Sequence, residues 1–233
     1  MQIKVEWSQE VSQKFPELAI CVGMIQNIKV KKENEQTRIL KKKTCEEARA
    51  NYDAETLKDN PTVRAYRSMY WKLGIDPTKT RPSGEALLRR VLHDKNLPTI
   101  STAVDAYNLA SMKTIVPISG FDCERLTPPF QVRFARGNEK FAGIGMTEPI
   151  ALESKMLVFG NGKQVLCIYP YRNCDHTKIT LKTHTAMIVG YGTPGLSPAQ
   201  LREAVKTTLS FIKQVSGGEI EAVETFQSTA GKQ

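Results

Sequence analysis

The spacing of hydrophobic residues changes at Pro117, and this change constrains the fold more than any other feature of the 233-residue chain. Before Pro117, apolar residues such as Val63, Tyr66 and Tyr70 recur at helical spacing. After it, segments such as FQVRFA (130–135) alternate polar and apolar residues, as strands do. A last segment near the C-terminus returns to helical spacing. This order predicts an α+β (mixed α/β) fold in which a mostly antiparallel or mixed sheet packs against helices.

Capping signals predict where the helices begin and end. Asn60 followed by Pro61 marks one start, and Gly74 marks the end of that helix. Further helices are expected with Pro82 at the first position, from Ser101 to about Lys113, and after Ser197, where Ser197 and Gln200 form a capping box and Gly217 ends the helix. We expect one domain over 1–233, because domains usually contain about 100 to 200 residues.

Charge and composition limit the partners and the compartment. The formal net charge of +9 favours polyanions such as nucleic acid or acidic membrane surfaces. The longest apolar run, LAICVGMI (18–25), is shorter than the roughly 18 residues of a membrane span, and MQIKVEWSQE (1–10) lacks the apolar centre of a signal peptide. Five cysteines without a pairing pattern suit a reducing compartment. We therefore expect a cytoplasmic protein that does not enter the membrane.

Common catalytic and cofactor motifs do not occur in the sequence. There is no Gly-x-Ser-x-Gly elbow, Walker loop or His-Glu-x-x-His motif, and GIGMTE (143–148) is an incomplete dinucleotide motif. No cofactor is expected. Cys167, Cys174, His176 and His184 are soft metal ligands, but they lack the close pairs of a usual zinc site, so a metal site stays only an alternative.

Two polar segments are candidates for binding. Asp105 and Asn108 share one face of the helix that follows Ser101, where they either line a pocket or bond the helix to loops. YRNCDHTKIT (171–180) follows an apolar strand, and it is either a binding segment or a plain loop. Its dense donors and acceptors are Arg172, Asn173, Asp175 and Thr177.

The stretch TRPSGEALLRR (80–90) places a glycine in the first turn of a helix. The backbone N–H groups around Ser83 and Gly84 suit an anion, and Arg89 and Arg90 follow. Tight packing against the helix after Ser101 would also require a residue without a side chain. Both interpretations stay open.

Several motifs resemble one family. Val104–Asn108 (VDAYN) and Pro117–Asp122 (PISGFD) resemble the B3/B4 domain, the tRNA-editing domain of the phenylalanyl-tRNA synthetase beta subunit. Freestanding members of that family are closer still, through Arg81–Leu87, Arg89, Arg90 and Thr177–Thr180. The resemblance is strong over about 60–195 and weak on the flanks, which include the C-terminal helix at 196–216.

The resemblance implies a freestanding deacylase that hydrolyses the ester of a mischarged aminoacyl-tRNA, with tRNA and not DNA as its partner. Ser119, Asp122 and Asn108 would be the catalytic residues. Those expected to bind substrate are Asp105, Arg172, Asn173, Asp175, Thr177 and Val189. Those expected to bind RNA are Arg81, Ser83, Gly84, Arg89 and Arg90. Association with a synthetase, the oligomeric state and the amino acid and tRNA that are edited are left open.

Four positions depart from the family pattern. Ser119 replaces the family histidine, Asn173 and Cys174 replace two glycines, and Val189 replaces the glutamate that recognises a tyrosine hydroxyl. A buried tyrosine hydroxyl without that partner costs about 1 to 3 kcal/mol, so tyrosyl-tRNA is not the expected substrate. The loss of the histidine keeps a second hypothesis open, a noncatalytic module that binds tRNA or an amino acid.

Overall fold

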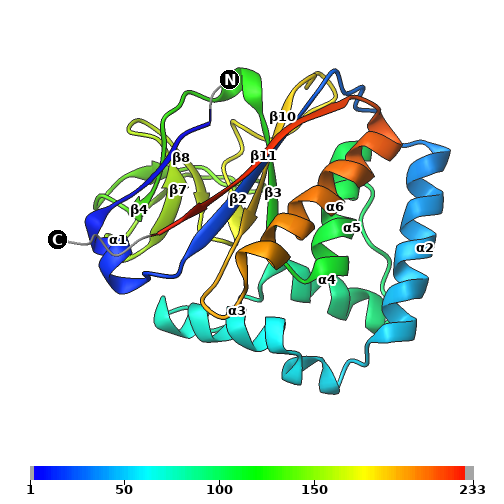
Figure 1. Cartoon of the computed structure of the whole chain (residues 1–233), viewed down its shortest axis with the longest axis horizontal. Helices are drawn as coiled ribbons and strands as arrows, with labels where there is room; N and C mark the ends of the chain where they lie inside the picture. Colours follow the sequence, from blue (N-terminus) through cyan, green and yellow to red (C-terminus); the bar gives the residue numbers. More distant parts are fainter. Residues whose placement is uncertain (1–2, 229–233) are drawn as a thin grey trace.

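The structure, a computed structural model, describes residues 3–228, so the extreme ends of the predicted 1–233 domain lie outside it (Figure 1). The α-helices are α1 Gln9–Lys14, α2 Glu35–Asn51, α3 Pro61–Lys72, α4 Ser83–Leu92, α5 Thr102–Thr114 and α6 Pro198–Ser216. The strands are β1 Val5–Trp7, β2 Ala19–Gln26, β3 Ile118–Asp122, β4 Phe130–Phe134, β5 Lys140–Phe141, β6 Ile150–Ala151, β7 Leu157–Gly160, β8 Val165–Ile168, β9 Arg172–Asn173, β10 Ala186–Tyr191 and β11 Glu219–Gln227. Two 3₁₀ turns, Thr56–Asp59 and Cys123–Arg125, complete the elements.

The elements form three layers (Figure 1). The middle layer is an antiparallel sheet in the order β11-β2-β10-β3. Helices α5 and α6 cover one face of this sheet, and α2 and α4 pack outside α5. A second sheet, β1-β4-β7-β8-β9, packs on the other face, and its β1–β4 pair is parallel. The predicted α+β class with a mixed sheet is therefore confirmed.

Strand β2 shows how one strand serves two cores. Successive side chains of a strand point to opposite faces of the sheet. The core under the helices takes Ala19, Cys21 and Ile25, whereas the core between the two sheets takes Ile20, Val22 and Met24. Because helices cover one face of β2 and the second sheet covers the other, nearly all of its residues are apolar.

Glycines in the middle sheet allow α6 to approach closely. A Cβ atom at Gly23 of β2 would lie 2.6 Å from Leu209 Cδ1, and one at Gly190 of β10 would lie 2.8 Å from Val205 Cγ2. Both contacts are shorter than carbon atoms tolerate. The two glycines therefore set the distance between helix and sheet.

The capping signals predict the helix ends well. Asn60, Ser101 and Ser197 cap their helices through side-chain oxygens, and Gln200 completes the capping box. Pro82 is the N-cap of α4 and not its first helical residue, a shift of one position. The sequence patterns do not predict strands β1 and β11. The last element of the chain is therefore β11, where a helix was expected to come last. None of the helices within 3–228 combines the length and apolar character needed to cross a bilayer.

Candidate functional site

Two edge strands bring the polar segment 171–180 against the PISGFD motif. Strand β3 is one edge of the middle sheet, and β9 is one edge of the second sheet. Between them, the Ser119 hydroxyl donates a 2.6 Å hydrogen bond to Oδ1 of Asn173. The chain then continues along β3, where the Asp122 amide donates to the Thr177 carbonyl at 2.9 Å. Segment 171–180 thus connects the two sheets beside Ser119.

Cys167 and Tyr191 adjoin Ser119, and Tyr70 adjoins Cys167. We call the five residues Ser119, Asn173, Cys167, Tyr191 and Tyr70 the inter-sheet polar cluster. Val189 pairs with Ser119 across β10 and β3, and Tyr191 lies two residues further along the same face of β10. Burial raises the pKa of Tyr191 well above its usual value, with Cys167 and Ser119 as close neighbours. Burial likewise raises the pKa of the Cys167 thiol to about 12.

Two hydroxyls of this cluster are buried without partners. Tyr191 Oη and Tyr70 Oη have no partner at hydrogen-bond geometry within residues 3–228, although the Cys167 and Ser119 side chains adjoin Tyr191. Tyr70 comes from α3, where its ring lies 6.4 Å from the Tyr171 ring. A buried hydroxyl that lacks a partner costs about 1 to 3 kcal/mol. Such groups are rare in folded proteins and are explained best where a ligand or water completes them.

A loop after β5 supports Asn173 from behind. The Ile144 amide donates to the Asn173 carbonyl at 2.9 Å, and Arg172 Nη1 donates to the Ile144 carbonyl at 3.3 Å. A Cβ atom at Gly143 would lie 2.7 Å from Arg172 Cδ, so glycine lets the arginine stem lie flat over the loop. Arg172 is thereby fixed at the exposed edge next to Asn173.

Asp122 lies on the same strand as Ser119 but on its other face. Gly120 faces Tyr107 of α5, and strand alternation puts Asp122 on that side. Its two carboxylate oxygens already accept hydrogen bonds, from Thr183 Oγ1 at 2.7 Å and from the Glu124 amide at 3.1 Å. These bonds hold the end of β3 to the loop before β10, and the carboxylate is not directed at Ser119.

The remaining residues of segment 171–180 divide between the surface and the interior. Asp175 is half-exposed and forms an ion pair with Lys178, with 2.7 Å between Oδ1 and Nζ. Thr177 is fully buried, and its hydroxyl has no partner among the described residues. Thr177 is therefore a better candidate for ligand contact than Asp175.

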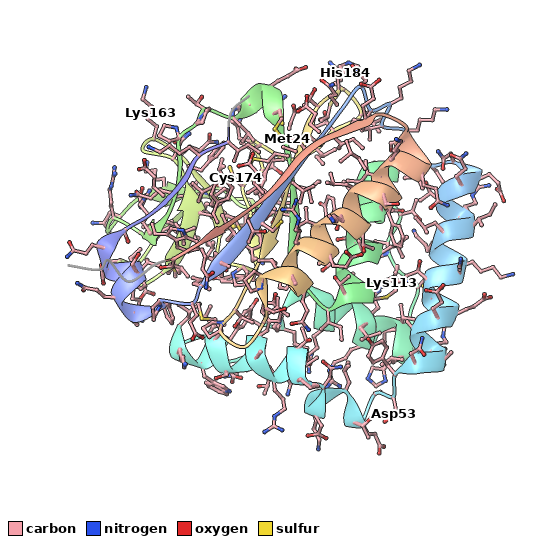
Figure 2. The ribbon with its side chains drawn as sticks, viewed as in Figure 1. Met24, Asp53, Lys113, Lys163, Cys174 and His184 are labelled. Carbon is pink, nitrogen blue, oxygen red and sulfur yellow. The ribbon has the colours of Figure 1, made fainter. Side chains whose placement is uncertain are left out.

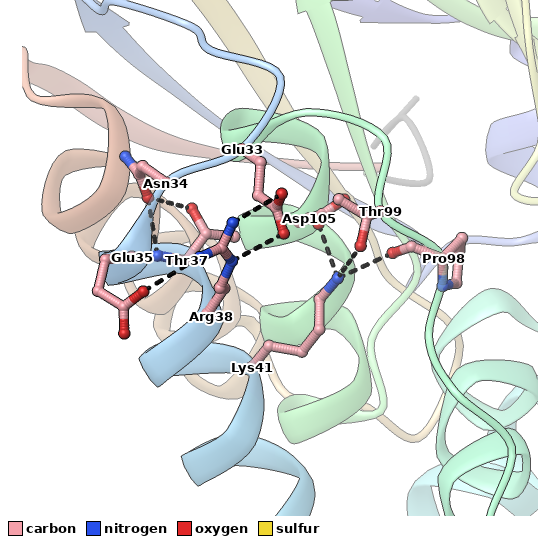
Figure 3. A network of polar contacts seen from close by, with 9 residues as sticks. All are labelled: Glu33, Asn34, Glu35, Thr37, Arg38, Lys41, Pro98, Thr99 and Asp105. Carbon is pink, nitrogen blue, oxygen red and sulfur yellow. Dashed lines mark hydrogen bonds and ion pairs between the residues drawn. The ribbon is translucent and has the colours of Figure 1, made fainter.

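Asp105 belongs to a different region, between α2 and α5 (Figure 3). Its Oδ2 lies 2.8 Å from Lys41 Nζ, and its Oδ1 accepts from the Ile100 amide at 2.9 Å. Two positions along a helix differ by about 200° in direction, so Asp105 points away from β3 when Tyr107 points toward it. Of the two interpretations of Asp105, the structure supports the one in which it bonds the helix to a loop. Asn108 is partly exposed and has no side-chain hydrogen bond within 3–228.

The glycine of TRPSGEALLRR packs against α5. A Cβ atom at Gly84 would lie 2.7 Å from the Ile115 carbonyl carbon and 2.8 Å from the Ser111 carbonyl oxygen. Both neighbours are backbone atoms and cannot move aside. Ser83 meets the same helix through Ser111, with 3.5 Å between the two hydroxyl oxygens. The structure thus supplies a packing reason for Gly84.

The buried carboxylate of Glu85 occupies the first turn of α4. It accepts hydrogen bonds from Arg67 Nε at 3.0 Å and from Arg89 Nε at 2.7 Å. Burial opposes its ionisation, but the bonds from the two arginines outweigh burial and lower the pKa of Glu85. Arg89 is therefore held against Glu85 and only partly exposed, whereas Arg81 and Arg90 are exposed.

The four soft ligands considered for a metal are not alike in environment. Cys167 and Cys174 are buried, but His176 and His184 are exposed. Figure 2 shows Cys174 within the fold and His184 at its edge. Within residues 3–228, no three His, Cys, Asp or Glu side chains are grouped as a metal site requires.

Sequence patterns missed Tyr70 and Tyr191. Tyr191 follows Val189 by two residues in an alternating strand, which places both on the face next to Ser119. That signal was available in the sequence. Tyr70 shares the helical spacing of ordinary core residues, so nothing in the pattern separates it from them.

Comparison with known proteins agrees with this architecture. The chain belongs to the B3/4 domain family, whose match spans residues 65–217. It is 30% identical over 105 residues to the phenylalanine–tRNA ligase beta subunit of Coxiella burnetii, which is 45% of this chain and 13% of that protein. It is 23% identical over 159 residues to the beta subunit of Haemophilus ducreyi, covering 58% and 20% of the two chains. The chain thus spans a small part of these relatives.

A solved structure extends the likeness beyond the sequence matches. An N-terminal fragment of the phenylalanyl-tRNA synthetase beta subunit from Pyrococcus horikoshii superposes with a TM-score of 0.51 and 14% identity. The superposition covers 94% of this chain and 50% of the fragment. At this identity the likeness establishes the fold alone, and its coverage is wider than that of the family match.

Proposed function

We propose that this chain is a freestanding deacylase that hydrolyses the ester bond of a mischarged aminoacyl-tRNA. The observation that carries the proposal is the inter-sheet polar cluster, where Ser119 and Asn173 meet beside two buried hydroxyls without partners. The likeness to tRNA synthetase beta subunits supports tRNA as the partner. We further propose that the protein works in the cytoplasm, where charged tRNA is used.

Neither Cys167 nor Ser119 is suited to attack the ester itself. The raised pKa of Cys167, about 12, keeps its thiol protonated near neutral pH, and the thiolate is the nucleophilic form. Ser119 donates its proton to an amide oxygen, which is too weak a base to activate a hydroxyl. The reaction therefore uses water.

In the proposed reaction, the oxygen of a water molecule adds to the ester carbonyl carbon. The bond from that carbon to the ribose oxygen then breaks, and the ribose oxygen takes a proton. Because Oδ1 of Asn173 accepts from Ser119, its Nδ2 group is free to donate to the carbonyl oxygen as negative charge develops there. Ser119 positions Asn173, and the tyrosine hydroxyls hold the polar end of the amino acid.

The test is a panel of mischarged tRNAs incubated with the protein. We expect ester loss faster than in buffer for at least one tRNA charged with a polar amino acid, and Asn173→Ala to slow it about a hundredfold, the usual cost of a lost oxyanion donor. Asn173→Asp keeps the acceptor for Ser119 but lacks the donor, so it should be equally slow. Lys163→Ala, at an exposed turn, is the matched control.

The alternative is a noncatalytic module that binds tRNA or an amino acid, and Ser119 at the position of the family histidine favours it. Tight binding without accelerated ester loss on every tRNA of the panel would establish this alternative. Equal rates for Asn173→Ala and Lys163→Ala would instead refute the site.

A further inference from the structure

Helix α3 presents a tryptophan to solvent. The side chain of Trp71 is 59% exposed, although most large apolar side chains of the protein are buried. Its neighbour Tyr70 is fully buried and belongs to the inter-sheet polar cluster. One helix therefore carries a residue of the proposed site on one face and an exposed indole on another.

The exposed side chains of α3 around Trp71 are basic or polar. Arg64 lies seven residues before Trp71, which is two helical turns, so the two side chains share a face. Ser68 and Lys72 are also exposed, and α3 has no aspartate or glutamate along its length. Charged residues are depleted at the core of protein–protein interfaces, so the charged neighbours of this indole favour a polyanionic partner.

Positive charge continues from α3 onto α4. The Arg67–Glu85–Arg89 ion pairs join the two helices, and two guanidinium groups against one carboxylate leave a net charge of +1. Beyond them, a surface hollow of about 290 Å³ is bordered by Arg81, Arg90 and further basic side chains. None of the other large apolar side chains exposed within residues 3–228 lies on α3 or α4.

We propose that the outer face of α3 and α4 is a docking surface for RNA with unpaired bases, on which one base stacks against Trp71 while Arg64, Arg81 and Arg90 contact phosphates. Aromatic side chains within a basic surface bind single strands, because every base has a face that stacks and every nucleotide carries a phosphate. The choice of RNA rests on the proposed function, in which tRNA is the partner. RNA bound here contacts the helix that carries Tyr70.

The test uses Trp71 as its own reporter. The chain has two tryptophans, so a Trp7→Phe variant leaves Trp71 as the single indole. Titration of this variant with deacylated tRNA and with oligouridylate should quench its fluorescence, and a fully paired RNA duplex should quench it less. Unchanged emission at RNA concentrations that saturate binding would overturn the proposal.

Affinity measurements with variants separate stacking from charge. Trp71→Leu should weaken binding of oligouridylate about tenfold, and Trp71→Phe should restore most of the loss, since one stacked base is worth about that much. Arg64→Ala should lower the slope of log affinity against log salt by about 0.7, one single-strand phosphate contact. Ile39→Ala, at a side chain on α2 that is 57% exposed, is the control and should change nothing.

The outcomes distinguish this surface from the proposed reaction. The binding assays use RNA without an amino acid, so they do not depend on ester hydrolysis. If the protein binds RNA through Trp71 but hydrolyses no ester, the docking surface stands and the deacylase proposal is refuted. If instead the protein hydrolyses mischarged tRNA, and Trp71→Leu binds RNA as tightly as the unaltered chain, the deacylase proposal stands and the docking surface is refuted.

Discussion

The inter-sheet polar cluster and the Lys41–Asp105 contact both include buried polar side chains but differ in how their polar atoms are paired. Lys41 Nζ donates to Asp105 at 2.8 Å, to the Pro98 carbonyl at 3.0 Å and to Thr99 at 3.1 Å, so all three donors are used (Figure 3). The cluster contains Tyr70 and Tyr191, whose hydroxyls have no partner in the described chain. Full pairing is what a structural role requires, whereas unpaired groups are expected where a ligand binds.

The largest effect should come from the tightly packed helical layer. Gly84→Leu would force a side chain into the backbone of α5, and we expect the free energy of unfolding to fall by about 3 kcal/mol, measured in urea. Gly162→Leu is the control, because a Cβ atom there would have no neighbour within 4 Å. A stable Gly84→Leu protein that no longer binds RNA would reverse the interpretation and make this turn an anion site.

Asp105→Ala should destabilise the protein by about 2 to 3 kcal/mol, because it leaves the Lys41 ammonium and the Ile100 amide without their acceptor. Thermal unfolding measures the change. Glu153→Ala removes a comparable ion pair to Lys155 at the surface, where both side chains are more than half exposed, and should cost less than about 1 kcal/mol. If the two variants unfold alike, the paired network is not a stability element, and Asp105 becomes available for the substrate role.

Two buried tyrosines test the cluster, because the hydroxyl of Tyr66 has a hydrogen-bond partner and that of Tyr191 has none within the described residues. Tyr66 Oη donates to the Tyr191 carbonyl at 2.6 Å, so Tyr66→Phe should cost about 1 to 2 kcal/mol. Tyr191→Phe removes a hydroxyl without a partner, so the free energy of unfolding should rise, by up to about 1 to 3 kcal/mol, while substrate binding weakens. Equal losses of stability would show that the Tyr191 hydroxyl is bonded in solution, which would remove the main support for the site.

The smallest effect concerns alkaline pH. Burial raises the pKa of Cys167 from 9.0 to about 12, so the folded protein keeps a proton that the unfolded chain releases. The unfolded state then binds fewer protons, and this contribution to stability is present below pH 9 and is lost as the pH rises toward about 12. Cys167→Ala should therefore show a shallower decline of stability with pH over that window. A decline as steep as in the unaltered chain would place the thiol in contact with water.

Local signals in the sequence predict the helices and the fold class because they depend on near neighbours. Ser197 with Gln200, and Asn60 with Pro61, specify their helix starts without reference to the rest of the chain. Strand β11 escaped prediction because it pairs with β2, about 200 residues earlier, and its own residues are mostly exposed. Pairing over such a separation leaves no short-range pattern.

The candidate site was predictable in part. The resemblance directed attention to Ser119, Asn173 and Thr177, and the structure brings the first two into direct contact. Asp105 and Asp122 belong to the same motifs, yet helix rotation and strand alternation turn both away from that contact. A motif records which residues occur together, but the direction of each side chain depends on the face of the element that bears it.

The position of β2 has a consequence for how the chain acquires its structure. It lies between β10 and β11, so this central strand, made early in synthesis, stays without either neighbour until almost the whole chain is present. Contacts of such long range slow folding and leave an apolar strand edge exposed meanwhile. A fragment cut to residues 65–217, the span of the family match, would lack β1, β2 and β11 and should expose the apolar face of α6 that packs on β2 and β11.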